Sequence, residues 1–129
     1  MIGKAISTIL SSYTNLTDIV SNRIYPILAK AGTNLPLIEY TVDTITPEYT
    51  KAGWIGDDVD FSVISTALSY KLANELATEV RNALEETSGL QNGITIQKIY
   101  MDGFTEDFDL DGDSYIINLR FRTRVTAYS

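Results

Sequence analysis

Residues 115–126, YIINLRFRTRVT, alternate cleanly between apolar and polar side chains. A period of two is typical of a β-strand with one face buried and the other open. The side chains of the apolar face are Tyr115, Ile117, Leu119, Phe121 and Val125. The polar face carries Asn118 and three arginines, Arg120, Arg122 and Arg124. The stretch therefore predicts a strand in a sheet whose apolar face is covered by other elements.

Three further segments have strand patterns. Residues 36–45 place Ile38, Tyr40 and Val42 on one face, and residues 58–65 do the same with Val59, Phe61 and Val63. Residues 94–105 also read as a strand, although their apolar residues fall on both faces. Residues 46–57 are a polar connection, so the first two strands are expected to form a hairpin.

Two amphipathic helices are expected beside these strands. The first is indicated by apolar residues at helical spacing that stop near Asn15, namely Ile2, Ile6, Ile9, Leu10 and Tyr13. The second begins after Ser69, whose hydroxyl is suited to cap the first turn. Its apolar face is formed by Leu72, Ala73, Leu76, Ala77, Val80, Ala83 and Leu84. The sequence predicts a single α+β domain over residues 1–129, a two-layer fold with a mainly antiparallel sheet of about four strands covered on one face by two helices.

Composition argues against most catalytic and metal chemistry. The chain has no cysteine and no histidine, which removes thiolate nucleophiles, imidazole bases and the usual zinc ligands. We therefore expect no enzyme activity, no catalytic residue, no cofactor and no metal. A net charge of −7 also disfavours direct nucleic-acid binding. Neither an export signal nor an apolar run of roughly 20 residues is apparent, so an intracellular protein without a membrane partner is expected.

The most specific local motif is Asp107–Asp113, DFDLDGD, which matches the first half of an EF-hand calcium loop. The second half is missing, because Asn118 stands where a bidentate glutamate is needed and the surrounding pattern is that of a strand. A hairpin turn explains these residues better, since Asp and Gly favour tight turns. A weak cation site of another type is the alternative.

The stripe of Arg120, Arg122 and Arg124 needs acidic neighbours, because like charges two apart on a strand lie on one face. The acids expected near it are Glu39, Asp43, Asp58 and Asp60. Either these residues pair with the arginines within the chain as a charge ladder, or they belong to the next copy across an interface. Contact with nucleic acid is a third, less favoured reading.

Tyr49 and the single tryptophan, Trp54, lie in the polar connection rather than in an apolar stripe. Aromatic side chains in such positions are often contact anchors for a partner. Packing back onto the core is an equally good explanation. Both residues are candidates for a partner interface.

Several phrases along nearly the whole chain resemble the tail completion, or tail terminator, proteins of tailed bacteriophages. The phrases are NRIYPILAKAGTNLPLIEYTV (22–42), DDVDFSVIS (57–65), SYKLANELATEVRNAL (69–84) and EDFDLDGDSYIINLRFRTRV (106–125). The resemblance lies in the order of elements and in these diffuse phrases, without an invariant chemical motif.

The resemblance implies a virion structural protein in the neck region of the tail, assembled in the host cytoplasm. Such a protein forms a homo-oligomeric ring, expected to contain six copies, that ends the tail tube and offers a surface to the head connector. Its expected partners are itself, the tail tube protein and the head connector protein. A head–tail connector or other neck protein is the alternative, followed by a small cation- or ligand-binding module.

Overall fold

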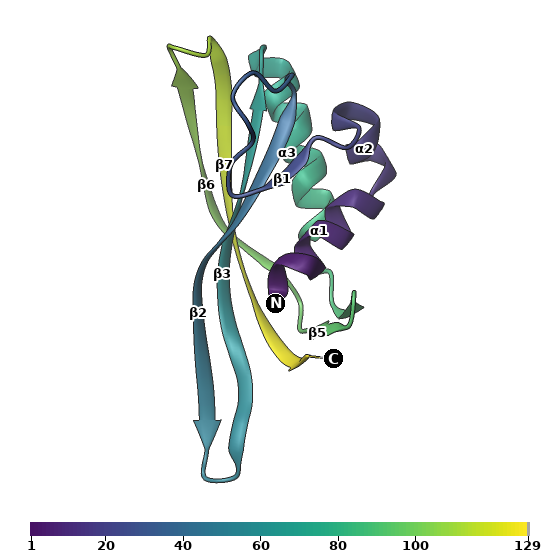
Figure 1. The fold of residues 1–129 in the computed structure, drawn as a ribbon, viewed down its shortest axis with the longest axis vertical. Coiled ribbons are helices and arrows are strands. Elements are labelled where there is room, and N and C mark those ends of the chain that lie inside the picture. The colour runs from purple at the N-terminus through teal and green to yellow at the C-terminus, as the bar shows by residue number, and fades with distance from the viewer. Residues whose placement is uncertain (129) are drawn as a thin grey trace.

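The computed structural model describes residues 1–128. Its helices are α1 (Ile2–Ser12), α2 (Thr14–Val20) and α3 (Tyr70–Leu84). Its strands are β1 (Ile24–Pro26), β2 (Leu37–Thr50), β3 (Gly53–Ala67), β4 (Gly89–Gln91), β5 (Ile94–Ile96), β6 (Tyr100–Asp109) and β7 (Ser114–Tyr128). Figure 1 shows the helices packed on one side of a long, twisted sheet.

The sheet has seven strands in the order β1-β2-β3-β7-β5-β4, and β6 pairs with β7 as well. β1 runs parallel to β2, whereas the other pairs are antiparallel, so the sheet is mixed. The predicted sheet of about four strands under two helices is therefore wrong. Strands β1, β4 and β5 have three residues each, which is too short to show a periodic pattern in the sequence.

The expected strand over residues 94–105 is divided into β5 and β6 by residues 97–99. Ile99 turns into the core and is 1% exposed. Its backbone is held on both sides, because Ile99 N donates to Thr87 O over 3.0 Å and Ile99 O accepts from Glu86 N over 2.7 Å. Burying this side chain takes the connector out of line with the sheet, and this explains why apolar residues fell on both faces of the sequence pattern.

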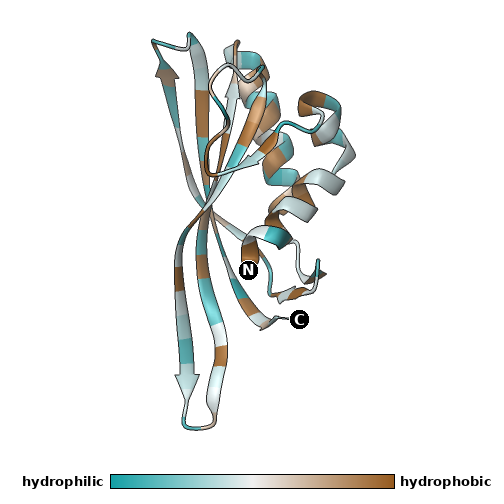
Figure 2. Cartoon of the chain, in the orientation of Figure 1, coloured by the Kyte–Doolittle hydropathy of each residue, from teal (hydrophilic) through white to brown (hydrophobic). Residues whose placement is uncertain are grey.

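The core lies between the helices and the inner face of the sheet. Phe61 on β3 and Phe121 on β7 are cross-strand partners, and their rings stack with centroids 5.4 Å apart. Leu10, Leu16 and Leu76, one from each helix, are fully buried in the same hydrophobic cluster. Figure 2 shows hydrophobic residues on the inner sides of the helices and along the central strands.

Two helix predictions have different outcomes. Ser69 caps α3 as expected, because its side-chain oxygen accepts from Leu72 N over 3.1 Å. The first helix, however, ends at Ser12 rather than near Asn15, since Tyr13 is extended (φ −89°, ψ 105°), and α2 begins at Thr14. None of the helices in residues 1–128 is long and apolar enough to cross a membrane.

The segment expected as a polar connection, residues 46–57, is instead a continuation of β2 and β3. The two strands remain paired to Thr50 and Gly53, and only Lys51 and Ala52 lie between them. Every residue from 46 to 55 is exposed. The result is a hairpin that extends past the helices and past the end of β7 (Figure 1). We call residues 46–57 the projecting hairpin.

Candidate functional site

The three arginines lie on the face of the sheet that is turned away from the helices, which we call the outer face. The register of β3 and β7 places Arg124 opposite Asp58, Arg122 opposite Asp60 and Arg120 opposite Ser62. The side chains between them, such as Phe121, point into the core. The three arginines therefore lie on one face of the sheet, as the alternation predicted.

Arg124 is fully engaged within the chain. Its Nη1 donates to Asp58 Oδ1 over 2.8 Å and lies 3.5 Å from Glu48 Oε2. The hydrogen bond that the guanidinium donates to Asp58 is the main cause of a raised pKa for Arg124. The guanidinium covers Gly56, where an added Cβ would be 2.7 Å from Nη2. For this arginine the charge-ladder reading is the one that the geometry favours.

Arg120 and Arg122 are different, since no carboxylate among residues 1–128 lies within 4.0 Å of either guanidinium. Arg122 is exposed, although Asp60 is its cross-strand neighbour. Arg120 crosses to β6 and lies over Gly103, where an added Cβ would be 2.8 Å from Nη2. Two of the three arginines are thus available for a partner.

The other two acids are used locally. Glu39 Oε2 accepts from Ala29 N over 2.6 Å, which ties the loop after β1 to β2. Asp43 lies at an irregularity in the β2–β3 ladder and accepts a hydrogen bond from Ser62 Oγ. Neither residue lies within salt-bridge distance of an arginine or opposite one in the register. Of the four expected acids, Asp58 pairs with Arg124, and Asp60 lies opposite Arg122 without forming a salt bridge.

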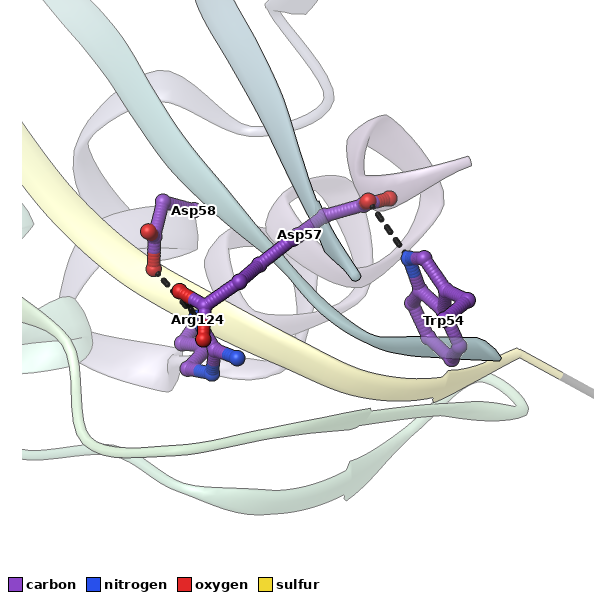
Figure 3. A network of polar contacts seen from close by, with 5 residues as sticks. Trp54, Asp57, Asp58 and Arg124 are labelled. Carbon is purple, nitrogen blue, oxygen red and sulfur yellow. Dashed lines mark hydrogen bonds and ion pairs between the residues drawn. The ribbon is translucent and has the colours of Figure 1, made fainter. Parts of the chain in front are cut away.

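Trp54 is attached to the base of the projecting hairpin by a buried carboxylate (Figure 3). Asp57 is 7% exposed, and its Oδ1 accepts from Trp54 Nε1 over 2.9 Å. Its Oδ2 accepts from the hydroxyl of Tyr128 over 2.6 Å. The Trp54 and Tyr128 rings lie 5.9 Å apart. Burial and this hydrogen bond raise the pKa of Tyr128 to about 12.

Tyr49 has no such attachment. It lies opposite Trp54 in the hairpin ladder and is 66% exposed, and Ile55 on the neighbouring strand is also exposed. Beyond Asp57, no third strand or helix within residues 1–128 covers the hairpin. Of the two aromatic candidates, Trp54 therefore folds back onto the C-terminal strand, while Tyr49 stands free on the hairpin.

Several residues that build this region were not predicted. They are Glu48, Gly56, Asp57, Gly103 and Tyr128. Glu48 and Asp57 lie in the segment that was expected to be a connection. Their contacts with Arg124 and Tyr128 on β7 could be recognised only once the pairing of β2 and β3 was known to extend to Thr50 and Gly53. The alternation gave no signal for Tyr128, because it is in phase with the three arginines and not with the apolar face of its strand.

The acidic turn closes the β6–β7 hairpin, as its sequence predicted. Asp109 Oδ1 accepts from Asp111 N, and Asp107 Oδ1 accepts from Phe108 N. Asn118 lies within β7 rather than at a calcium-loop position. Within residues 1–128 no group of three acidic side chains is arranged to hold a metal ion.

Comparison with known proteins identifies the family. The family model described as "Tail completion protein gp17" matches residues 4–126. The chain belongs to the tail completion protein gp17 family. The resemblance noted in the sequence is thus confirmed, and the chain is a structural protein of a phage tail, located in the virion.

A solved structure shares the fold of this tail completion protein. A chain from "Virion of native gene transfer agent (GTA) particle" superposes with a TM-score of 0.81 at 17% sequence identity. The superposition covers 95% of this chain and 92% of that chain. No curated protein matches the sequence. As a tail component, the protein works through contacts with other proteins of the virion.

Proposed function

We propose that this protein acts as a single domain that forms a ring of six copies at the head-proximal end of the tail tube. The ring ends tube polymerisation and provides the surface on which the head connector is joined. The role is structural and not catalytic. Family membership over residues 4–126 supports the place in the tail, and the absence of cysteine and histidine supports the lack of catalysis.

The observation that carries this proposal is the projecting hairpin. A two-stranded ribbon with no further cover is marginally stable in water, so a long exposed one is explained best by a partner that covers it. Tyr49 and Ile55 supply exposed apolar area near its end. The hairpin would contact an axial neighbour in the tail, while the outer face of the sheet would contact the next copy in the ring.

Tail length measures this function directly. Tails assembled without the protein should show an uncontrolled length distribution in electron micrographs and should fail to join heads. Tails of normal length joined to heads in its absence would overturn the proposal. Gold-labelled protein should decorate only the head-proximal end of the tail, which also distinguishes a terminator from a connector bound to heads alone.

The role of the hairpin is tested with Tyr49→Ser combined with Ile55→Ser. Both side chains are exposed, so the fold should be retained while tail joining is lost. Leu90→Ser is the matched control, because Leu90 is similarly exposed (67%) but lies on β4, away from the hairpin. Equal tail assembly by both variants would contradict a role for the hairpin.

A further inference from the structure

Basic residues are concentrated in one region of this acidic protein. Four of the ten Lys and Arg residues, Lys98, Arg120, Arg122 and Arg124, lie on β7 or on the connector beside it. Of these four, only Arg124 has a carboxylate within 4.0 Å among residues 1–128. Lys98, Arg120 and Arg122 have no carboxylate within salt-bridge distance among residues 1–128.

A hollow of about 530 Å³ lies at this place. Its charged and aromatic lining consists of Asp58, Asp60, Lys98, Tyr100, Arg122 and Arg124. The connector of residues 97–99 forms one wall and is held by Thr123 Oγ1, which donates to Gln97 O over 2.8 Å. The hollow is thus part of the folded sheet. Its wall carries two cations without a salt bridge, Lys98 and Arg122, one carboxylate without a salt bridge, Asp60, and the half-exposed ring of Tyr100.

The acidic turn between β6 and β7 carries the opposite charge. Residues 106–113 contain five acids, Glu106, Asp107, Asp109, Asp111 and Asp113, and no basic residue. No Lys or Arg among residues 1–128 forms a salt bridge with any of them. At the end of the turn Leu110 is 85% exposed. An apolar side chain surrounded by carboxylates that form no salt bridge is suited to enter a hollow in which basic residues outnumber acidic ones.

This turn cannot reach the hollow of its own chain. β7 is one continuous strand from Ser114 to Tyr128, and Ser114 and Arg122 are eight residues apart. At about 3.3 Å per residue, roughly 26 Å separates the turn from Arg122. A contact between the turn and the hollow therefore requires a second molecule.

We propose that the acidic turn of one copy docks into the Lys98–Arg122 hollow of the next copy. Leu110 packs against Tyr100, and the aspartates of the turn face Lys98, Arg120 and Arg122. The contact joins two different patches, so it repeats head to tail and closes into a ring when the rotation permits. This inference rests on the proposed ring and names the surfaces that form it.

Charge exchange tests the contact. Asp111→Lys alone, and Lys98→Glu with Arg122→Glu, should each weaken association in the tail by about tenfold or more, because like charges then meet. Combining all three changes should restore association. Asp111 is chosen because its side chain makes no hydrogen bond in the fold. Full association by both unpaired variants, or no rescue by the combination, would overturn the proposal.

Cross-linking gives an independent measurement that does not depend on weakening the assembly. The chain has no cysteine, so Leu110→Cys with Tyr100→Cys introduces a unique pair. In assembled tails, oxidation should yield a ladder of disulfide-linked oligomers. Leu110→Cys with Leu90→Cys is the control and should remain monomeric, because Leu90 on β4 is not among the residues that line the hollow.

The two proposals fail in different ways. Tails that retain normal length and head joining, together with an absent ladder in the Leu110–Tyr100 pair, would refute this contact and leave the terminator role intact. Normal tails in the complete absence of the protein would instead refute the terminator role.

Discussion

The hydroxyl of Tyr128 donates to Oδ2 of Asp57 over 2.6 Å and thereby joins the C-terminal strand to the base of the projecting hairpin. Asp57 also accepts from Trp54, so one buried carboxylate holds two aromatic side chains. Beyond this point no other strand or helix of the described chain, residues 1–128, covers the hairpin. Its orientation relative to the sheet therefore depends on this small network.

Removing the carboxylate should destabilise the fold and loosen the hairpin. Asp57→Ala leaves two donors without their acceptor, and we expect the free energy of unfolding to fall by about 1–3 kcal/mol. Tyr128→Phe removes one hydrogen bond at a half-exposed position and should cost about 1 kcal/mol. Urea denaturation followed by circular dichroism measures both values. An unchanged Trp54 fluorescence spectrum in Asp57→Ala would contradict the network.

The raised pKa of Tyr128 predicts a window of alkaline destabilisation. Burial, with the hydrogen bond to Asp57, raises this pKa to about 12, whereas an unfolded tyrosine titrates near pH ~10. The folded state therefore holds its proton more tightly. The stabilisation that the protonated Tyr128 hydroxyl contributes is present below pH ~10 and is lost as the pH rises through about 12. The difference in stability between wild type and Tyr128→Phe should shrink across this range. A constant difference would be inconsistent with the shift.

Gly103 is predicted to be intolerant of substitution. Its φ of +143° is rarely adopted by other residues, and an added Cβ would be 2.8 Å from Arg120 Nη2. Gly103→Ala should lower the free energy of unfolding by about 1–3 kcal/mol. Gly3→Ala is the control, because Gly3 is helical and a Cβ there meets only Tyr40 Cε2 at 4.0 Å. That change should stabilise the protein by about 0.4–1 kcal/mol.

Calcium should leave the stability unchanged. Asp107 and Asp109 accept backbone hydrogen bonds that shape the turn, and Asn118 is part of β7. Specific binding to the native state must raise Tm, so thermal melts with and without millimolar calcium are a direct test. A reproducible rise that is lost in Asp111→Asn would establish a cation site.

The local sequence pattern was sufficient to predict an element wherever that element is long and has a single apolar face. The alternation of residues 115–126 placed the three arginines on one face, and Ser69 marked the start of α3 correctly. Both signals depend on residues within a few positions of each other. The phrases spread along the chain were also enough to indicate the tail completion family, which the match over residues 4–126 confirmed.

Only the tertiary structure revealed the features that depend on pairing between strands distant in sequence. Strands of three residues formed because neighbouring strands satisfied their backbones, and residues 46–57 became a hairpin because β2 and β3 keep their register. The register of β3 and β7 also places Asp58 within salt-bridge distance of Arg124, whereas no carboxylate among residues 1–128 lies within 4.0 Å of Arg122. The four candidate acids had looked equivalent in the sequence. Periodicity shows which face a side chain occupies, but only the pairing of strands distant in sequence determines which residue lies opposite it.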